Sequence, residues 1–412
     1  MRRPQVPARA AAAGLALALA AGACADPVAP RPAGPARAVA ATAVTAGEVF
    51  ARYVALGTSN SQGAASGGIS AATQRAAWPA VLAARAGVPL TLPLVQAPGC
   101  TPPLPAPLAA SVALVAAFGA FGAGDDLIGA VSGTCAPLAA GIVPPTRSVA
   151  ISGADVHDAL TTTPEGAAQR SPRVGMLYAR VLGPGQTQVT AMLAQQPTFV
   201  SVELAANDVL PASTGRVAAM TPYASWQADY DAVLAAVRST GARAVLVGLP
   251  DDAARFPSIR RARELWNQAP ALLALGIAVS PSCYFSTNHV FLPGYLLTLL
   301  QRTPATATCA DVPGAVDHVL TAADVQAINA RMAQMNAHMQ RRAAEQGYAY
   351  FALSALYDLP KPALDVGRVL FSGAPFGAAM SLDGVHPSAA GQALLAAEAV
   401  RAINARYGLA IR

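Results

Sequence analysis

Residues 53–63 read YVALGTSNSQG, and this stretch decides how the chain folds. The uncharged run YVALG lacks clean polar alternation, which is typical of a β-strand buried on both faces. A polar loop with Ser59 and Ser61 follows directly after Gly57. Open α/β sheets bind ligands beyond the carboxyl ends of their strands. The loop is therefore a candidate functional site.

Four further runs of the same kind follow along the chain: SVAIS (148–152), TFVSVEL (198–204), AVLVGL (244–249) and YAYFAL (348–353). Between and after them, apolar residues recur at helical spacing in residues 73–86, 187–196, 224–241, 321–347 and 387–408. Strands that alternate with helices indicate a parallel sheet covered on both faces. The sequence thus predicts an α/β fold, a three-layer α/β/α sandwich with about five parallel strands.

Two long segments interrupt this rhythm, and we expect both to be inserted loops of a single domain over residues 48–412. Residues 87–147 are rich in Pro, Gly and Ala, and residues 250–320 have no clear periodicity. The apolar piece 108–124 contains three glycines and is slightly short for a membrane span. We interpret it as a buried or site-lining loop helix.

Composition and charge exclude two classes of protein. Of the 412 residues, 54% are hydrophobic and 12% charged, which rules out an intrinsically disordered chain. The formal net charge is +6, but residues 1–23 hold three arginines and no acidic residue, so without them it is +3. A nucleic-acid binder needs a basic stripe with exposed aromatic residues, and the sequence has none. We expect no nucleic-acid partner.

The N-terminus resembles an export signal. Arginines precede the apolar run AAAGLALALAAGA, which ends at Cys24, so we interpret residues 1–23 as a signal peptide. LAAGAC (19–24) resembles a bacterial lipobox, in which Cys24 would be lipidated; plain cleavage at Ala23 or Ala25 is the alternative. Residues 24–47 are Pro/Ala-rich and predict a tether. The protein would be exported, either membrane-anchored in the cell envelope (the outer membrane if the host has one) or secreted.

The other four cysteines suggest two disulfides. Exported proteins with an even number of cysteines commonly pair them, and Cys100, Cys135, Cys283 and Cys309 allow three pairings. The sequence-local pairing would staple both irregular segments. None of the cysteines has the spacing of a metal site, so we expect no metal.

Three further blocks carry candidate chemistry. The loop SLDGVHP (381–387) places Asp383 three residues before His386, where an Asp could orient an imidazole that acts as a base. Asn207 follows the run 198–204 and could donate through its amide. Gly153 follows the run 148–152 and could offer a backbone N–H to an oxyanion. Each block alone has an ordinary explanation as a turn or cap.

Together, the four blocks in this order resemble the SGNH (GDSL) hydrolases over about residues 50–408. The resemblance implies a flavodoxin-like three-layer fold and serine ester hydrolysis without a cofactor. Ser59 would be the nucleophile, His386 the general base and acid, and Asp383 its orienter. The oxyanion hole would comprise the Ser59 and Gly153 N–H groups and the Asn207 side chain.

Two positions depart from the family pattern. Thr58 stands where the family has the Asp of its G-D-S block, a mainly structural residue whose local bonding Thr can partly replace. Ala205 stands where the third block usually has Gly, and its methyl group could shift the aim of Asn207. Neither change removes a proton-transfer or oxyanion group.

The resulting hypothesis is a serine esterase or lipase acting on a small-molecule or lipid ester. Its activity should fall as the pH drops through roughly 6–7, where a histidine base takes up a proton. The apolar segments 104–124 and 290–300 could line an acyl pocket, although they could equally be core packing. One alternative is a non-catalytic lipid- or carbohydrate-binding lipoprotein on the same frame, and another is a surface-anchored structural protein. Acyl-chain length and alcohol are left open.

Overall fold

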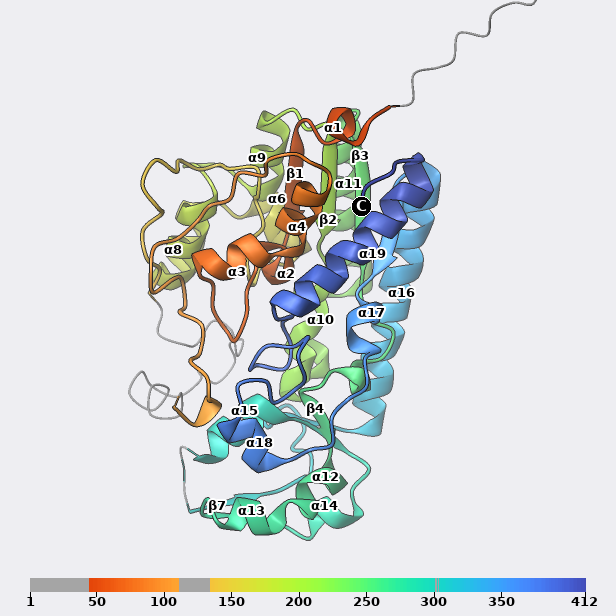
Figure 1. Cartoon of the computed structure of the whole chain (residues 1–412). Coiled ribbons are helices and arrows are strands. Elements are labelled where there is room, and N and C mark those ends of the chain that lie inside the picture. The colour runs from red at the N-terminus through yellow and green to blue at the C-terminus, as the bar shows by residue number, and fades with distance from the viewer. Residues whose placement is uncertain (1–43, 111–133, 301, 303) are drawn as a thin grey trace, which may run out of the picture. The chain divides into compact units, whose positions relative to one another are not determined.

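A parallel four-stranded sheet forms the centre of the fold in the computed structural model, which describes residues 44–110, 134–300, 302 and 304–412 (Figure 1). The strand order is β1-β2-β3-β9. The bounds are Tyr53–Gly57 for β1, Phe199–Glu203 for β2, Arg243–Gly248 for β3 and Ala349–Ala352 for β9. The register aligns the ends of β1 and β2, with Gly57 opposite Glu203. All four strands were predicted from their apolar runs.

A fifth segment lies along the outer side of β1. Ala55 donates to Arg147 O and accepts from Val149 N, both at 2.9 Å, and Ile151 N donates to Gly57 O at 3.0 Å. The predicted run 148–152 therefore pairs in parallel with β1, although its only ladder pair is the bridge between Ser148 and Ala55. With this segment the strands follow the flavodoxin-like order, in agreement with the fold that the family resemblance implies.

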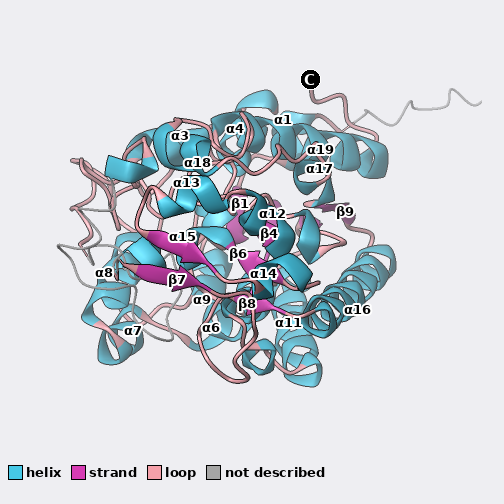
Figure 2. Ribbon diagram, turned by 90° about the horizontal axis from the view of Figure 1, so that it is seen from below, coloured by secondary structure: helices cyan, strands magenta, loops and turns pink. Residues whose placement is uncertain are grey.

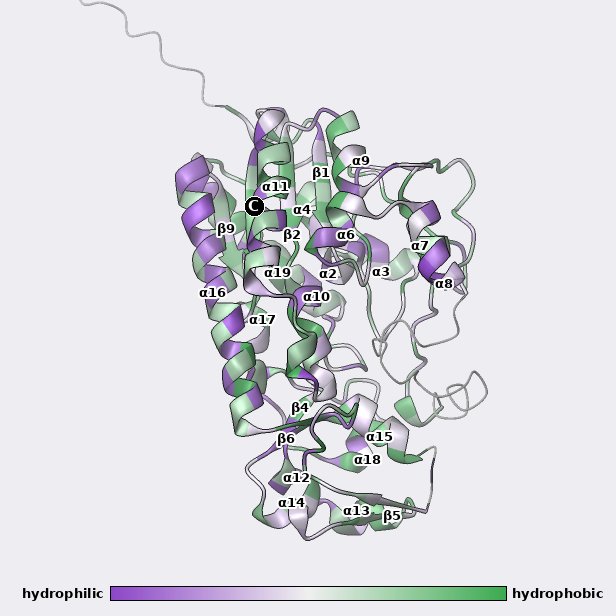
Figure 3. Cartoon of the chain, turned by 180° about the vertical axis from the view of Figure 1, so that it is seen from behind, coloured by the Kyte–Doolittle hydropathy of each residue, from purple (hydrophilic) through white to green (hydrophobic). Residues whose placement is uncertain are grey.

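Side chains alternate between the two faces of the sheet and fill two separate cores. In β1, Tyr53 and Ala55 belong to one core, whereas Val54 and Leu56 belong to the other. This period of two is the geometry of a strand, and both faces are apolar because helices cover both. One core lies on each face of the sheet, between the sheet and a layer of helices, so the domain has three layers. Figure 3 shows the sheet strands largely in the hydrophobic colour.

Helices on either face supply the outer layers. The first core is covered by α4 (Trp78–Arg85) and α19 (Ala389–Tyr407). The second core is covered by α6 (Val156–Thr161), α8 (Pro172–Val181), α9 (Gln188–Ala194), α11 (Tyr223–Ser239) and α16 (Ala322–Gln346), with α7 (Pro164–Arg170) packed on α8. The remaining short helices outside residues 250–320 are α1 (Ala46–Val49), α2 (Ser59–Gln62), α3 (Ala71–Ala76), α10 (Ala206–Val209), η1 (Leu210–Thr214), η2 (Val217–Ala219), α17 (Ser354–Tyr357) and α18 (Val366–Phe371).

Local sequence explains where the predicted helices begin and end. In α16, Thr321 and Asp324 form a reciprocal capping box, and Gly347 ends the helix with φ 73°. The predicted helix over 73–86 is instead two helices, α3 and α4, which meet at Ala77. Pro79 explains the break, because its ring would clash with the carbonyl group four residues earlier in a continuous helix.

The segment 250–320 is more ordered than its sequence predicted. It contains a three-stranded antiparallel sheet, β4-β6-β8, and a parallel pair, β5-β7 (Figure 2). The bounds are η3 Ala253–Arg255, β4 Ile259–Arg261, α12 Ala262–Asn267, α13 Ala269–Leu273, β5 Ile277–Val279, α14 Ser282–Phe285, β6 His289–Phe291, α15 Leu292–Leu300, β7 Ala305–Ala307 and β8 Val319–Leu320. We call this segment the insertion. Strands of two or three residues are too short for a periodic pattern, which is why sequence alone missed them.

Two sequence predictions concern other parts of the chain. The apolar piece 108–124 falls outside the described residues from position 111 onward. Within the part of the chain that the structure describes, no helix is both long enough and apolar enough to cross a membrane.

Candidate active site

Ser59 is the first residue of α2, directly after the end of β1. The residue is 5% exposed. Gly57 allows the loop to turn tightly, because a Cβ atom there would lie only 2.5 Å from Ser61 Oγ. In the described part of the chain, the Ser59 N–H donates to no protein acceptor, as expected in the first turn of a helix. This N–H is therefore available to a ligand.

A buried carboxylate that the sequence analysis did not single out holds this loop. Glu203, the last residue of β2, is 2% exposed. Its carboxylate accepts from the N–H and hydroxyl of Thr58 at 3.0 and 2.9 Å, and from the N–H and hydroxyl of Ser61 at 3.2 and 2.9 Å. Burial raises the pKa of Glu203, and the hydrogen bonds from Thr58 and Ser61 oppose that shift.

The Thr58 departure thus has a structural explanation. Sequence reasoning expected Thr58 to bond local backbone, and the structure instead pairs it with Glu203, 145 residues away. One sequence signal could have found Glu203: it is the sole charged residue in the run TFVSVEL, and a buried charge must be paired.

His386 and Asp383 form a buried pair. His386 Nδ1 lies 2.7 Å from Asp383 Oδ2, and the His386 side chain is 2% exposed. With Asp383 ionised, the Nδ1–H group donates a hydrogen bond to the carboxylate. In the neutral imidazole with this tautomer, the other ring nitrogen, Nε2, is an acceptor, which a general base requires.

Asp383 is held in place from several sides. Its Oδ1 accepts from Ser381 Oγ, Val385 N and His386 N at 2.8–2.9 Å, and its Oδ2 also accepts from Gly67 N at 2.9 Å. Burial by itself would raise the pKa of Asp383. The neighbouring His386 and the backbone donors outweigh burial and lower that pKa to about 2. The carboxylate is therefore ionised at neutral pH.

The two other candidate oxyanion groups come from neighbouring loops. Asn207 Nδ2 donates to Ala154 O at 2.8 Å, so the Asn207 amide lies next to the Gly153 loop. Nδ2 carries a second hydrogen, which this bond does not use. Gly153 is exposed with φ +83°, and its N–H donates to no acceptor within the described residues. Gln62 Oε1 accepts from Ser152 N at 2.7 Å and so ties this loop to α2.

An apolar pocket at the carboxyl ends of the strands brings most of these groups together. Ser59, Asn207 and His386 all line it, whereas Gly153 is not among its lining residues. Ser59 Oγ and His386 are not hydrogen-bonded to each other in the described structure, a looseness common in sites without substrate. Phe291 lines the pocket, so one residue of the segment 290–300, which we expected could line an acyl pocket, does lie beside Ser59 and His386. The segment 104–124 contributes no lining residue within its described part.

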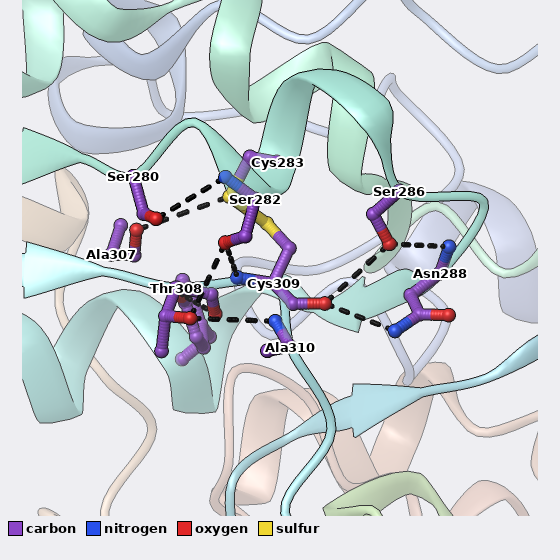
Figure 4. Close-up of a disulfide and its surroundings, with 10 residues drawn as sticks. Ser280, Ser282, Cys283, Ser286, Asn288, Ala307, Thr308, Cys309 and Ala310 are labelled. Atoms are coloured by element: carbon purple, nitrogen blue, oxygen red, sulfur yellow. Dashed lines mark hydrogen bonds between the residues drawn. A yellow bond between two sulfur atoms is a disulfide. The ribbon is translucent and has the colours of Figure 1, made fainter.

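The cysteines pair locally. Cys100 bonds to Cys135 and Cys283 to Cys309, which is one of the three pairings left open by the sequence. Figure 4 shows the second disulfide, where Asn288 Nδ2 donates to Cys309 O at 3.0 Å. Cys24 lies outside the described residues. No group of three His, Cys, Asp or Glu side chains suited to a metal ion occurs among the residues described.

Comparison with known proteins agrees with this architecture. The family model described as GDSL-like lipase/acylhydrolase matches residues 53–399, and the chain belongs to that family. The protein is thus a member of a hydrolase family, and membership supports ester hydrolysis in general. A search of curated proteins found no match.

Two solved structures are similar to the chain. One is a mutant of Axe2, an acetyl-xylooligosaccharide esterase from Geobacillus stearmophilus, at 13% identity and a TM-score of 0.35, covering 87% of this chain and 95% of that one. The other is an extracellular lipase from Streptomyces rimosus, at 19% identity and a TM-score of 0.35, covering 86% of this chain and 98% of that one.

Proposed function

We propose that this protein is a serine esterase or lipase that hydrolyses carboxylic esters through an acyl-enzyme. The observation that carries the proposal is the buried Asp383–His386 pair, 2.7 Å apart, whose imidazole lines the same pocket as Ser59 and Asn207. An oriented imidazole beside a serine at the end of a strand is the arrangement that nucleophilic catalysis needs.

The proposed reaction has two steps. His386 Nε2 takes the Ser59 hydroxyl proton as Oγ attacks the ester carbonyl, and the same proton then passes to the departing alcohol. Water attacks the resulting acyl-serine and gives a proton to His386. The bond between the acyl carbon and Ser59 Oγ then breaks, the acid leaves, and His386 returns that proton to Oγ, which restores both residues. Asp383 keeps the imidazole in the required tautomer throughout and stabilises its charged form.

The oxyanion of each tetrahedral intermediate would be held by three donors: the Ser59 N–H, the Gly153 N–H and Asn207 Nδ2. The first two have no protein acceptor in the described residues, and the Asn207 amide retains one free hydrogen, which supports this assignment. Glu203 would act as a positioning residue, because it fixes both residues that flank the Ser59–Asn60 turn.

Hydrolysis of p-nitrophenyl butyrate tests the proposal. The purified full-length protein should release nitrophenolate, and Ser59→Ala should abolish the release because the covalent route disappears. Ser258→Ala is a matched control, since this serine is buried, its hydroxyl has no hydrogen-bond partner among the described residues, and it does not line the pocket. Equal activity in Ser59→Ala and wild type would refute the assignment of Ser59 as the nucleophile.

We further propose that the protein is exported and anchored through a lipid on Cys24, with residues 24–47 as a tether to a hydrolase domain over residues 48–412. Two disulfides support an oxidising compartment. Metabolic labelling with radioactive palmitate should mark wild type but not Cys24→Ser. Unlabelled wild type released into the medium would instead support plain cleavage.

A further inference from the structure

The pocket beside Ser59 is apolar well beyond the reacting groups. We infer that it binds the acyl chain of the ester, and that this chain is butanoyl or longer rather than acetyl, with the insertion forming part of the wall that contacts it. The inference rests on the proposed function, because it takes Ser59 and His386 as the reacting end of the pocket.

The chemistry of the lining supports an apolar ligand. No Asp, Glu, Lys or Arg side chain is among the described residues that line the pocket. Besides His386, the polar side chains are those of Ser59, Asn60, Asn207, Ser213 and Tyr357, and the Tyr357 hydroxyl already donates to Val385 O at 2.6 Å. Most of the remaining wall is aliphatic or aromatic carbon. A sugar or phosphate would need many more polar partners than this lining offers. An acetyl group, with one methyl beyond the carbonyl, would leave most of the apolar wall uncovered.

The insertion contributes one wall. Ile259 of β4 and Phe291 of β6 are directly paired across the antiparallel ribbon, and both line the pocket and are buried. Side chains that are directly opposite on such a ribbon lie on the same face and pack together. Ala253 and Phe256 of the same insertion extend this wall.

Helix α16 contributes to another part of the lining. Ile328 and Met332 are four residues apart, so they project from the same face of the helix. Val209 and Leu210 add further aliphatic surface from the segment that follows Asn207. A chain attached at Ser59 would thus meet apolar side chains from three separate elements.

The wall formed by the insertion is held in place by Lys361, which lies outside the insertion, and by hydrogen bonds within the insertion itself. Lys361 Nζ donates to the carbonyl oxygens of Ala254 and Ile259, and Leu292 N donates to Ser258 O at 2.8 Å. Phe291 N donates to His318 O, also at 2.8 Å. A wall held this way can discriminate acyl chains by length, because a pocket that does not collapse loses contacts when the chain is too short.

The test compares kcat/KM of the full-length protein for p-nitrophenyl acetate, butyrate, octanoate and palmitate. Each methylene that enters an apolar site should raise kcat/KM about fourfold. We expect butyrate to exceed acetate by about 10- to 20-fold on this basis. Acetate as the fastest substrate would overturn the inference.

Two variants test where the acyl chain of the substrate binds. Ala253→Leu should fill the pocket and lower the octanoate-to-acetate ratio of kcat/KM at least about tenfold, because overpacking excludes the longer chain. Leu292→Ala, next to Phe291 but in the other core and not lining the pocket, should destabilise the protein without changing that ratio. An unchanged ratio in Ala253→Leu would overturn the inference, since it would mean that the pocket holds the shared alcohol group.

The outcomes separate this inference from the proposed function. If no ester is hydrolysed in a Ser59-dependent way, the proposed function fails and the acyl assignment with it. If hydrolysis depends on Ser59 but acetate is preferred, the function stands and the acyl assignment alone fails.

Discussion

Glu203 accepts both the main-chain N–H and the hydroxyl of Thr58, at 3.0 and 2.9 Å. In this chain the position of the family's G-D-S aspartate is therefore neutral, and the carboxylate that anchors the loop comes from the neighbouring strand. The register of β1 and β2 makes this possible, because Gly57 and Glu203 are direct partners. The same carboxylate reaches Ser61, so it bridges both sides of the Ser59–Asn60 turn.

Glu203→Ala should reduce kcat by about 10- to 100-fold and lower the free energy of unfolding by about 2–4 kcal/mol, because buried donors on Thr58 and Ser61 lose their acceptor. Glu203→Gln should retain most of both, since its Oε1 can accept where Oε2 now does and its amide can donate to the Thr58 hydroxyl. Steady-state kinetics and urea unfolding measure the two effects. A Gln variant as damaged as the Ala variant would show that charge, not hydrogen bonding, matters at this position.

Thr58→Asp should lower activity at least about tenfold, although it restores the residue typical of the family. Its carboxylate would face Glu203 in a buried site, and two like charges at such close range cannot both ionise. Adding Glu203→Gln should recover most of the loss, because the amide introduced by that substitution can donate to the new carboxylate. The double-mutant cycle gives the coupling between the two sites. Additive losses in the cycle would contradict a direct interaction.

Asn207→Ala should lower kcat by about 10²–10³-fold, the usual cost of one oxyanion donor. KM for a short ester should change little, because the donor acts mainly in the transition state. Its thermal unfolding should remain cooperative, which circular dichroism can check. A near-wild-type kcat in folded Asn207→Ala would remove Asn207 from the proposed oxyanion hole.

Asp383→Asn should lower kcat by at least about 10²-fold, because an amide facing His386 Nδ1 favours the wrong imidazole tautomer. The pKa of Asp383 is lowered to about 2, so its ionised form stabilises the folded state above about pH 4 and that contribution is lost as the pH falls toward 2. We therefore expect the difference in unfolding free energy between wild type and Asp383→Asn to shrink by about 2 kcal/mol between pH 5 and pH 2. A difference that does not vary over this range would contradict the lowered pKa.

From the sequence alone the strands of the central sheet, the long helices and the order of the site blocks could be predicted. A short apolar run such as 244–249 is stable only when it is buried, so its local composition alone indicates a buried strand. Helix α16 carries both of its end signals, the Thr321–Asp324 box and Gly347, within its own segment. Asp383 and His386 are three residues apart, so their pairing could also be predicted from one short segment of the sequence.

Only the tertiary structure decided which distant groups meet. Thr58 and Glu203 lie 145 residues apart, and nothing in either local segment fixes the register that joins them. The insertion likewise gained its order from pairing, since β4, β6 and β8 are too short to form without one another. The pocket wall where Ile259 meets Phe291 follows from that pairing. Contacts that depend on strand register cannot be predicted from the periodicity of the sequence, because they form only when distant segments of the folded chain pair with each other.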